Sequence, residues 1–301
     1  MRAYTSLLLS PALLRQLEQF QLTANRRAKS SARGERRSRS RGQSVEFADY
    51  RNYAVGDDFR YLDWNTYGRL EKLFVKLYEE ERELPVHIFL DASESMTFGT
   101  PSKFSFACRL AAAIGYVALC GFDRVTVTVF PQLAGEPLAH SALRRVRGKK
   151  SALKFFEHLS QLRAGGEARL NSALRRGALE AARTGSAIVL SDFLDPEGYE
   201  GGLLSLVARG FHLQAIQILS GEELAPAVFG DLRLVDAETG SFQEVTFGRY
   251  RMAAYQQTVS NFCQRLREFC QSHGIGFFLA NSAKPLEDLL LKEFRRAEVW
   301  K

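Results

Sequence analysis

Between residues 84 and 301, short apolar runs alternate with stretches in which apolar residues recur every three or four positions. A short apolar run is typical of a buried strand, and the longer spacing is typical of one face of a helix. We expect strands at 86–90, 125–130, 187–190, 213–219 and 275–280, helices at about 103–119, 151–162, 171–183, 199–209 and 255–269, and a hairpin at 232–246. This alternation predicts an α/β fold, with a doubly wound, mostly parallel sheet and helices on both faces.

The N-terminal part of the chain follows a different pattern. Ser10 and Pro11 are typical of a helix start, and leucines follow them at helical spacing. Residues 73–78 alternate as a strand does, after a block rich in charged and aromatic residues. We therefore expect an N-terminal helix and strand extension at residues 1–83, followed by the α/β domain at residues 84–301.

The net charge of +7 comes from 41 Lys and Arg residues against 34 Asp and Glu residues. The whole excess lies in residues 26–41, which hold eight basic residues, one acidic residue and no aromatic residue. Nucleic-acid-binding domains usually spread basic residues over a folded face, with aromatic residues for base stacking. We interpret residues 26–41 as a solvated loop or a dock for an acidic partner surface, which makes a nucleic-acid partner the weaker hypothesis.

Cysteine usage and hydropathy indicate the compartment. Cys263 and Cys270 are seven residues apart in a helical pattern, about 10.5 Å along the axis, which is too far for a disulfide. No CxxC pair or histidine at zinc-ligand spacing occurs. The apolar run at residues 7–14 is short and interrupted by Ser-Pro, and no segment reaches the ~20 apolar residues of a membrane span. We expect a cytoplasmic protein with reduced thiols and no transmembrane segment.

Acidic residues follow two of the predicted strands. Asp91 begins a D-x-S-x-S motif with Ser93 and Ser95, and Asp192 follows the strand at 187–190. Ligands of open α/β sheets bind beyond the carboxyl ends of the strands, and carboxylate and hydroxyl oxygens suit a hard cation. We predict a Mg²⁺ site, with Mn²⁺ or Ca²⁺ as alternative ions and Asp192 holding a metal-bound water. The alternative is that the two serines cap the following helix.

These features resemble two related groups of proteins. The motif, the order of elements and Asp192 resemble the von Willebrand factor A fold with its metal-ion-dependent adhesion site. The upstream block resembles the domain of unknown function 58 family, through Glu46-Phe47, Arg51, Tyr53, Gly56-Asp57-Asp58, Arg60, Asp63-Trp64 and Arg69. The resemblance covers roughly residues 10–280 and implies a von Willebrand factor A-like, Rossmann-like domain.

The third loop of the implied metal site departs from the family pattern. That pattern has a Thr just after a Gly-Gly pair, whereas here Gly165-Gly166 is followed by Glu167. Glu167 either coordinates the cation directly or points to solvent and leaves a weak or empty site. We expect a retained but altered site.

The block at residues 42–70 allows two interpretations. One is functional: a docking surface for a partner, formed by Glu46, Arg51, Asp57, Asp58, Arg60, Asp63 and Arg69, or acids that approach the metal loops. The other is structural: a buried ion-pair network, with Trp64 and the tyrosines packing the segment against the α/β domain. Arginine–carboxylate pairs contribute geometric specificity more than net stability, and we favour the structural interpretation.

The implied function is that of a non-enzymatic adaptor whose cation binds an acidic residue of a partner. The family is similar to proteins encoded near MoxR-type AAA+ ATPases, which implies such an ATPase as the partner and a chaperone-like role in maturing a protein complex. No small-molecule substrate is expected.

Two other functions remain open at this point. One is a metal-dependent hydrolase with Asp91 as nucleophile, although phosphatases of that kind need a second Asp where Ser93 stands, and other catalytic motifs are absent from the sequence. The other is a nucleic-acid or membrane binder that uses residues 26–41.

Overall fold

The computed structural model describes residues 8–20, 22, 45–57, 59, 62–80, 84–132, 142–227, 230–235, 241–296 and 299–300. The chain divides into two units, one made of residues 1–31 and 84–301 and the other of residues 32–83. The predicted basic segment at 26–41 and the predicted docking residues Asp58 and Arg60 lie outside the described residues.

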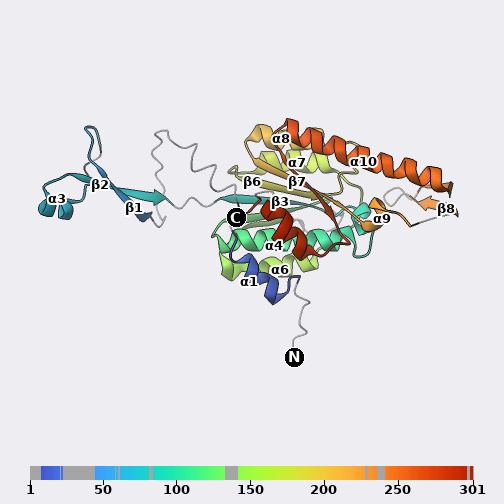
Figure 1. The fold of residues 1–301 in the computed structure, drawn as a ribbon, viewed down its shortest axis with the longest axis horizontal. Coiled ribbons are helices and arrows are strands. Elements are labelled where there is room, and N and C mark those ends of the chain that lie inside the picture. Colours follow the sequence, from blue (N-terminus) through green and yellow to red (C-terminus); the bar gives the residue numbers. More distant parts are fainter. Residues whose placement is uncertain are drawn as a thin grey trace, which may run out of the picture. The chain divides into compact units, whose positions relative to one another are not determined.

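The larger unit is built on a six-stranded sheet with the order β10-β7-β6-β3-β4-β5 (Figure 1). Its strands are β3 (Pro85–Asp91), β4 (Arg124–Phe130), β5 (Ala142–Arg147), β6 (Ser186–Ser191), β7 (His212–Leu219) and β10 (Gly276–Asn281). All neighbouring strands are parallel except β4 and β5. The predicted α/β class with a mostly parallel sheet is confirmed. The edge strand β5 was not predicted, because its sequence ALRRVR is rich in charge and buries only Val146.

Helices cover both faces of this sheet, as predicted (Figure 1). One face carries α1 (Pro11–Leu17), α4 (Lys103–Cys120) and α6 (Ala152–Gln161), and the other carries α7 (Leu170–Glu180), α8 (Glu200–Arg209) and α10 (Arg249–Ser272). Each face has its own apolar cluster, and β3 contributes to both because successive side chains alternate: Ile88 and Leu90 lie in one cluster and Phe89 in the other. Short helical segments are η2 (Glu94–Thr97), η3 (Lys149–Ser151), α9 (Gly221–Leu224), α11 (Leu286–Asp288), η4 (Leu289–Glu293) and α12 (Phe294–Arg296).

The chain divides after residue 83, where the boundary was expected, but the N-terminal helix belongs to the larger unit and not to an extension made of residues 1–83. Ser10 caps α1 by accepting a hydrogen bond from the Leu13 amide, as the sequence predicts. Leu13 and Leu17 are fully buried in the same apolar cluster as α4. Burial of these leucines is the physical reason why α1 groups with the α/β fold and not with the residues that follow it.

Among the described helices, α4 is the one long and apolar enough to cross a membrane, and 78% of that segment is buried inside the protein. Ser102 caps its first turn and Gly121 ends it. All four cysteines are free thiols. The cytoplasmic location stays a prediction.

The predicted late hairpin is present as β8 (Gly230–Val235) paired antiparallel with β9 (Phe242–Phe247), and its expected turn at 238–240 lies outside the described residues. In the smaller unit, β1 (Val45–Asn52) pairs antiparallel with β2 (Phe74–Glu80). A short helix, α3 (Trp64–Leu70), lies between them in sequence.

The order of the strands fixes where a ligand site is expected. From β3 the chain proceeds outward to β4 and β5, then returns to β6 on the other side of β3 and continues outward to β7 and β10. The direction of winding therefore reverses between β3 and β6, and open α/β sheets bind ligands at the carboxyl ends of the strands at such a point. Asp91 and Asp192 stand at these two ends.

Candidate functional site

Asp91 is held rigidly at the end of β3. It is 1% exposed. One carboxylate oxygen, Oδ1, accepts a hydrogen bond from the Ser93 amide at 2.9 Å, and Oδ2 accepts one from the Ser191 hydroxyl at the end of β6. The Ser191 oxygen in turn accepts from the Phe193 amide at 2.9 Å. The carboxylate thus links the two strands that flank the reversal in winding.

Three oxygen atoms converge beside this carboxylate. The Ser93 and Ser95 hydroxyl oxygens are 3.1 Å apart, and the Ser95 hydroxyl donates to Asp192 Oδ2 at 2.9 Å. Neighbouring ligands of an octahedral Mg²⁺ with bonds near 2.0–2.1 Å are about 2.9 Å apart, so the three oxygens have the spacing of adjacent ligands on a hard cation. The capping alternative for Ser93 is not supported, because its side chain makes no capping hydrogen bond to η2.

A buried lysine, which the sequence analysis missed, lies against Asp192. The Lys103 ammonium, 1% exposed, contacts Asp192 Oδ2 at 2.7 Å and Glu223 Oε1 at 2.6 Å. Glu223 is fixed by a capping box, in which its carboxylate accepts from the Ser220 amide and its own amide donates to the Ser220 hydroxyl. We call Asp91, Asp192, Lys103 and Glu223 the Asp192 cluster.

The pKa shifts in this cluster follow from burial and charge. Burial, and then the negative charge of Asp192, raise the pKa of Asp91 to about 7, against the smaller opposing effect of its hydrogen bonds. Burial by itself lowers the pKa of Lys103, but the charges and hydrogen bonds of Asp192 and Glu223 outweigh it, so the net shift is upward. Lys103 therefore stays protonated at neutral pH and compensates the charges of Asp192 and Glu223. The described contacts of the Asp91 carboxylate include no such cationic side chain.

The donor set fits a hard divalent cation. Asp192 and Glu223 share one ammonium, and Asp91 adds a further buried negative charge as the pH rises through its pKa of about 7, where an unpaired charge is strongly unfavourable. The described residues contain no group of three or more His, Cys, Asp and Glu side chains placed to bind a metal. A cation here would instead depend on the oxygens of Ser93, Ser95 and Asp192 with Asp91 behind them, and would share Asp192 with Lys103.

Glu167 is exposed, whereas the three oxygens belong to buried or half-buried residues. Its loop is anchored to the motif, because the Gly165 amide donates to the Ala92 carbonyl at 2.7 Å and the Glu94 amide donates to the Gly166 carbonyl at 2.9 Å. The Glu167 side chain is 63% exposed, and its carboxylate lies 3.8 Å from the Arg169 guanidinium. Of the two expected roles for Glu167, exposure to solvent describes its position in the structure.

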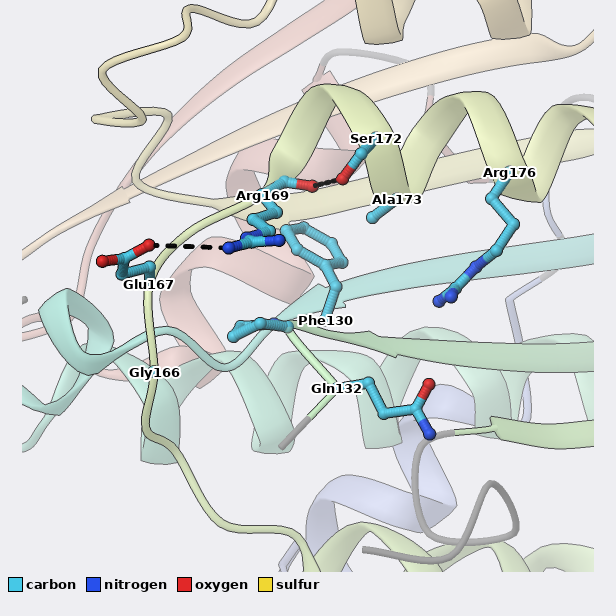
Figure 2. Close-up of a pocket in the computed structure, with 9 residues that line it drawn as sticks. Phe130, Gln132, Gly166, Glu167, Arg169, Ser172, Ala173 and Arg176 are labelled. Atoms are coloured by element: carbon cyan, nitrogen blue, oxygen red, sulfur yellow. Dashed lines mark hydrogen bonds and ion pairs between the residues drawn. The ribbon is translucent and has the colours of Figure 1, made fainter. Parts of the chain in front are cut away.

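A pocket of about 580 Å³ lies beside this loop, between the end of β4 and the start of α7 (Figure 2). Arg169, the N-cap residue of α7, and Arg176 of α7 extend into it, and Gln132 lies on the opposite wall (Figure 2). We call it the arginine pocket; the residues that line it are Phe130, Pro131, Gln132, Gly166, Glu167, Arg169, Ser172, Ala173 and Arg176. The main chains of Phe130 and Gly166 bond directly to the Asp91–Glu94 loop, so the pocket adjoins the Asp192 cluster.

The predicted docking residues in the smaller unit have internal roles where the structure describes them. Arg51 and Asp57 form an ion pair at 2.8 Å, and a hydrogen bond from the Ala54 amide, followed by Arg51, lowers the pKa of Asp57. Asp63 is buried and caps α3 through the amides of residues 65 and 66.

Arg69 lies in the last turn of α3, and Glu46 lies in β1 opposite Glu79 of β2. Asp63 is buried, but the Arg51–Asp57 pair and Trp64 are exposed, so the described residues do not form the buried ion-pair network that the structural interpretation expected.

Comparison with known proteins gives a family and a small set of relatives. A model of the family described as "protein of unknown function DUF58" matches residues 49–261. The uncharacterized protein Mb1516 of Mycobacterium bovis and the uncharacterized protein Rv1480 of Mycobacterium tuberculosis are each 28% identical over 244 residues, which cover 78% of this chain and 74% of the relative.

Among solved structures, the chain is similar to the conserved hypothetical protein BatB from Bacteroides thetaiotaomicron. The identity is 15% and the TM-score 0.40, over 71% of this chain and 98% of that one. This likeness is too distant to carry an argument. The family match confirms the expected resemblance to the DUF58 family, whereas the von Willebrand factor A-like fold and its metal-ion-dependent adhesion site stay predictions.

Proposed function

The chain belongs to the DUF58 family, and from this premise we propose that it is a non-enzymatic adaptor that binds an acidic side chain of a partner protein through a hard divalent cation. Ser93, Ser95 and Asp192 would hold the cation, with Asp91 balancing its charge from behind. A cation held by these residues would offer a coordination position to a carboxylate oxygen of the partner.

The observation that carries this proposal is the spacing of three oxygens. The Ser93, Ser95 and Asp192 oxygens follow one another at 3.1 and 2.9 Å at the reversal in winding of the sheet, where α/β folds bind ligands. The excess of negative charge around them favours a cation. The proposed von Willebrand factor A-like character of the domain is supported by the D-x-S-x-S motif, and Mg²⁺ is the ion that the sequence favours.

The partner that we propose is a MoxR-type AAA+ ATPase, with which the protein would assist the maturation of a protein complex. Support for this partner comes from the family resemblance of the sequence. A named partner makes the cation site testable, because a partner bound through the cation must be released when the cation is removed.

The first experiment measures cation binding by the full chain. We expect calorimetric titration with Mg²⁺, and with Mn²⁺ as a spectroscopic probe, to give one site that is lost in Ser93→Ala and Asp91→Ala. Ser105→Ala, which removes an exposed hydroxyl from α4, is the matched control and keeps the site. If wild type, Ser93→Ala and Asp91→Ala bound Mg²⁺ with equal affinity, the proposed cation site would be wrong.

The second experiment measures the partner. Purified protein should retain a purified MoxR-type ATPase in buffer with Mg²⁺ and release it in EDTA, and Ser93→Ala should weaken the complex at least about tenfold. If the ATPase were retained as well in EDTA as in Mg²⁺, and as well by Ser93→Ala and Asp91→Ala as by wild type, it would not bind through the cation.

A further inference from the structure

The arginine pocket carries positive charge that its own acids neutralise poorly. Arg169 contacts Glu167 at 3.8 Å, and Arg176 contacts Glu180 at 3.9 Å. Glu180 is shared, because the Arg144 guanidinium lies closer to it, at 3.0 Å. Both distances from the pocket arginines exceed those of a charge-assisted hydrogen bond, which are about 2.7–2.9 Å. Two guanidinium groups in the pocket are therefore available for a better acceptor.

The two arginines approach the pocket from the same side. Arg169 is the N-cap residue of α7 and has a non-helical backbone, Arg176 lies within the helix, and both line the pocket on one face of α7 (Figure 2). Ser172 and Ala173 lie between them on that face and bring no bulky side chain to it (Figure 2). A ligand that spans the pocket can thus reach both guanidiniums.

We propose that the arginine pocket binds an acidic segment of the partner protein, with one carboxylate on Arg169 and a second on Arg176. The Gln132 amide, on the opposite wall, is a further donor for the second carboxylate. Glu167 takes the place of the first carboxylate when no partner is bound and is displaced on binding. This inference rests on the proposed protein-binding role, but it does not depend on the cation.

The lining of the pocket favours carboxylates over nucleic acid. The aromatic residue of the pocket, Phe130, is 1% exposed, so no ring is available for stacking a base. The anchoring of the Glu167 loop to the D-x-S-x-S motif places the pocket beside the proposed cation, so two acidic residues of one partner segment and a third on the cation would form one continuous interface.

The test uses a fluorescein-labelled peptide with the sequence Glu-Glu-Ser repeated four times, which presents carboxylates at many separations, and its Gln-Gln-Ser counterpart. Binding to the full chain is measured by fluorescence anisotropy in EDTA, where a cation cannot contribute. We expect the Glu peptide to bind and the Gln peptide not to bind. Arg169→Gln combined with Arg176→Gln should weaken binding by about tenfold or more, which corresponds to about 1.4 kcal/mol.

The matched control is Arg175→Gln combined with Arg183→Gln. It makes the same change in net charge, but the Arg175 guanidinium lies against Gly201 of α8, and Arg183 lies at the amino end of β6. The control pair should bind the Glu peptide like wild type, and Glu167→Gln should bind it more tightly because the internal competitor is gone.

Three results would overturn the inference: no preference for the Glu peptide, equal losses in the two arginine pairs, or displacement of the peptide by inorganic phosphate at concentrations where acetate has no effect. The last result would assign the pocket to a phosphate ligand. The peptide assay is done in EDTA, so its outcome does not depend on whether the chain binds a cation. Likewise, the Mg²⁺ titration does not depend on whether the arginine pocket binds the peptide.

Discussion

In the Asp192 cluster, Lys103 pairs with Asp192 and Glu223 at short distances in a largely buried place, whereas the arginines of the adjoining arginine pocket are exposed and loosely paired. Lys103 contacts two carboxylates at 2.6 and 2.7 Å with 1% of its side chain exposed. Arg169 contacts one carboxylate at 3.8 Å with 71% of its side chain exposed. The first arrangement fixes the loops in place, and the second leaves charge free to meet a partner.

The difference follows from desolvation. Removing Lys103 from water is expensive, and two acids at hydrogen-bonding distance are needed to offset that loss. Arg169 keeps most of its hydration, so its contact with Glu167 contributes little and is easily exchanged. The two regions thus illustrate how one edge of a sheet can combine a rigid charged core with an adaptable charged surface.

The largest effect is expected from removing the buried ammonium. Lys103→Met keeps much of the side-chain volume but leaves Asp192 and Glu223 without their cation, so we expect a loss of about 3–5 kcal/mol in the free energy of unfolding. Urea unfolding followed by circular dichroism measures it. Lys154→Met, at an exposed position of α6, is the matched control and should change stability by less than about 0.5 kcal/mol.

The loss should be partly recovered when the two acids are neutralised as well. A triple variant, with Asp192→Asn and Glu223→Gln added to Lys103→Met, no longer buries an unpaired charge. If the single variant were as stable as the Lys154 control, the buried ion pairs would not hold this end of the sheet.

A pH-dependent effect of intermediate size is expected from Asp91. Its pKa of about 7 lies above the value of about 4 of an unfolded aspartate, so the folded state binds the proton more tightly and stability falls as the pH rises from about 4 to about 7. Asp91→Asn removes this titration. In EDTA at about pH 8 we expect the variant to be more stable than wild type by about 1–4 kcal/mol, and the gap to close toward pH 4.

Mg²⁺ should reverse that order, since the cation stabilises the ionised carboxylate of the wild type and not the amide. Thermal melts at several pH values, with and without Mg²⁺, measure both effects. If the stability of wild type and of Asp91→Asn changed in parallel with pH in EDTA, the Asp91 carboxyl would not have a raised pKa in the folded state.

Much of the fold could be predicted from the sequence because its signals are local. The strands β3, β4, β6, β7 and β10 are apolar runs, and the Ser10 cap of α1 depends on residues three positions apart. The convergence of Asp91, Ser93 and Asp192 was also predictable, since both segments directly follow buried parallel strands. The strands β1 and β5 were missed because charged residues interrupt their apolar alternation.

The charges that complete the site could not be predicted, since they depend on distant pairings. Lys103 lies 89 residues from Asp192 and 120 residues from Glu223. A weak signal existed: a lysine in the first turn opposes the helix dipole, and Ser220-x-x-Glu223 has the spacing of a capping box. Neither pattern reveals the pairing, which requires the packing of α4 and α9 against the end of β6.

Substitutions in the arginine pocket are expected to affect stability very little. Glu167→Gln and Arg169→Gln remove an exposed pair at 3.8 Å, so each should change the free energy of unfolding by less than about 0.5 kcal/mol. The same urea titrations measure this. A loss near that of Lys103→Met would show that the pocket is part of the rigid core and would contradict its proposed role as an exchangeable surface.

The smallest effect is that of ionic strength, which tests most closely the contrast between the Asp192 cluster and the arginine pocket. The Debye length falls from about 14 Å at about 0.05 M to about 4 Å at 0.5 M, so exposed charges are screened and buried pairs are not. Over this range, the stability difference between wild type and Lys103→Met should change by less than about 0.5 kcal/mol, while binding of the Glu peptide weakens severalfold. A stability difference that shrinks in parallel with peptide binding would show that water and ions reach the Lys103 ammonium, which would place both sets of charges in the same exposed environment.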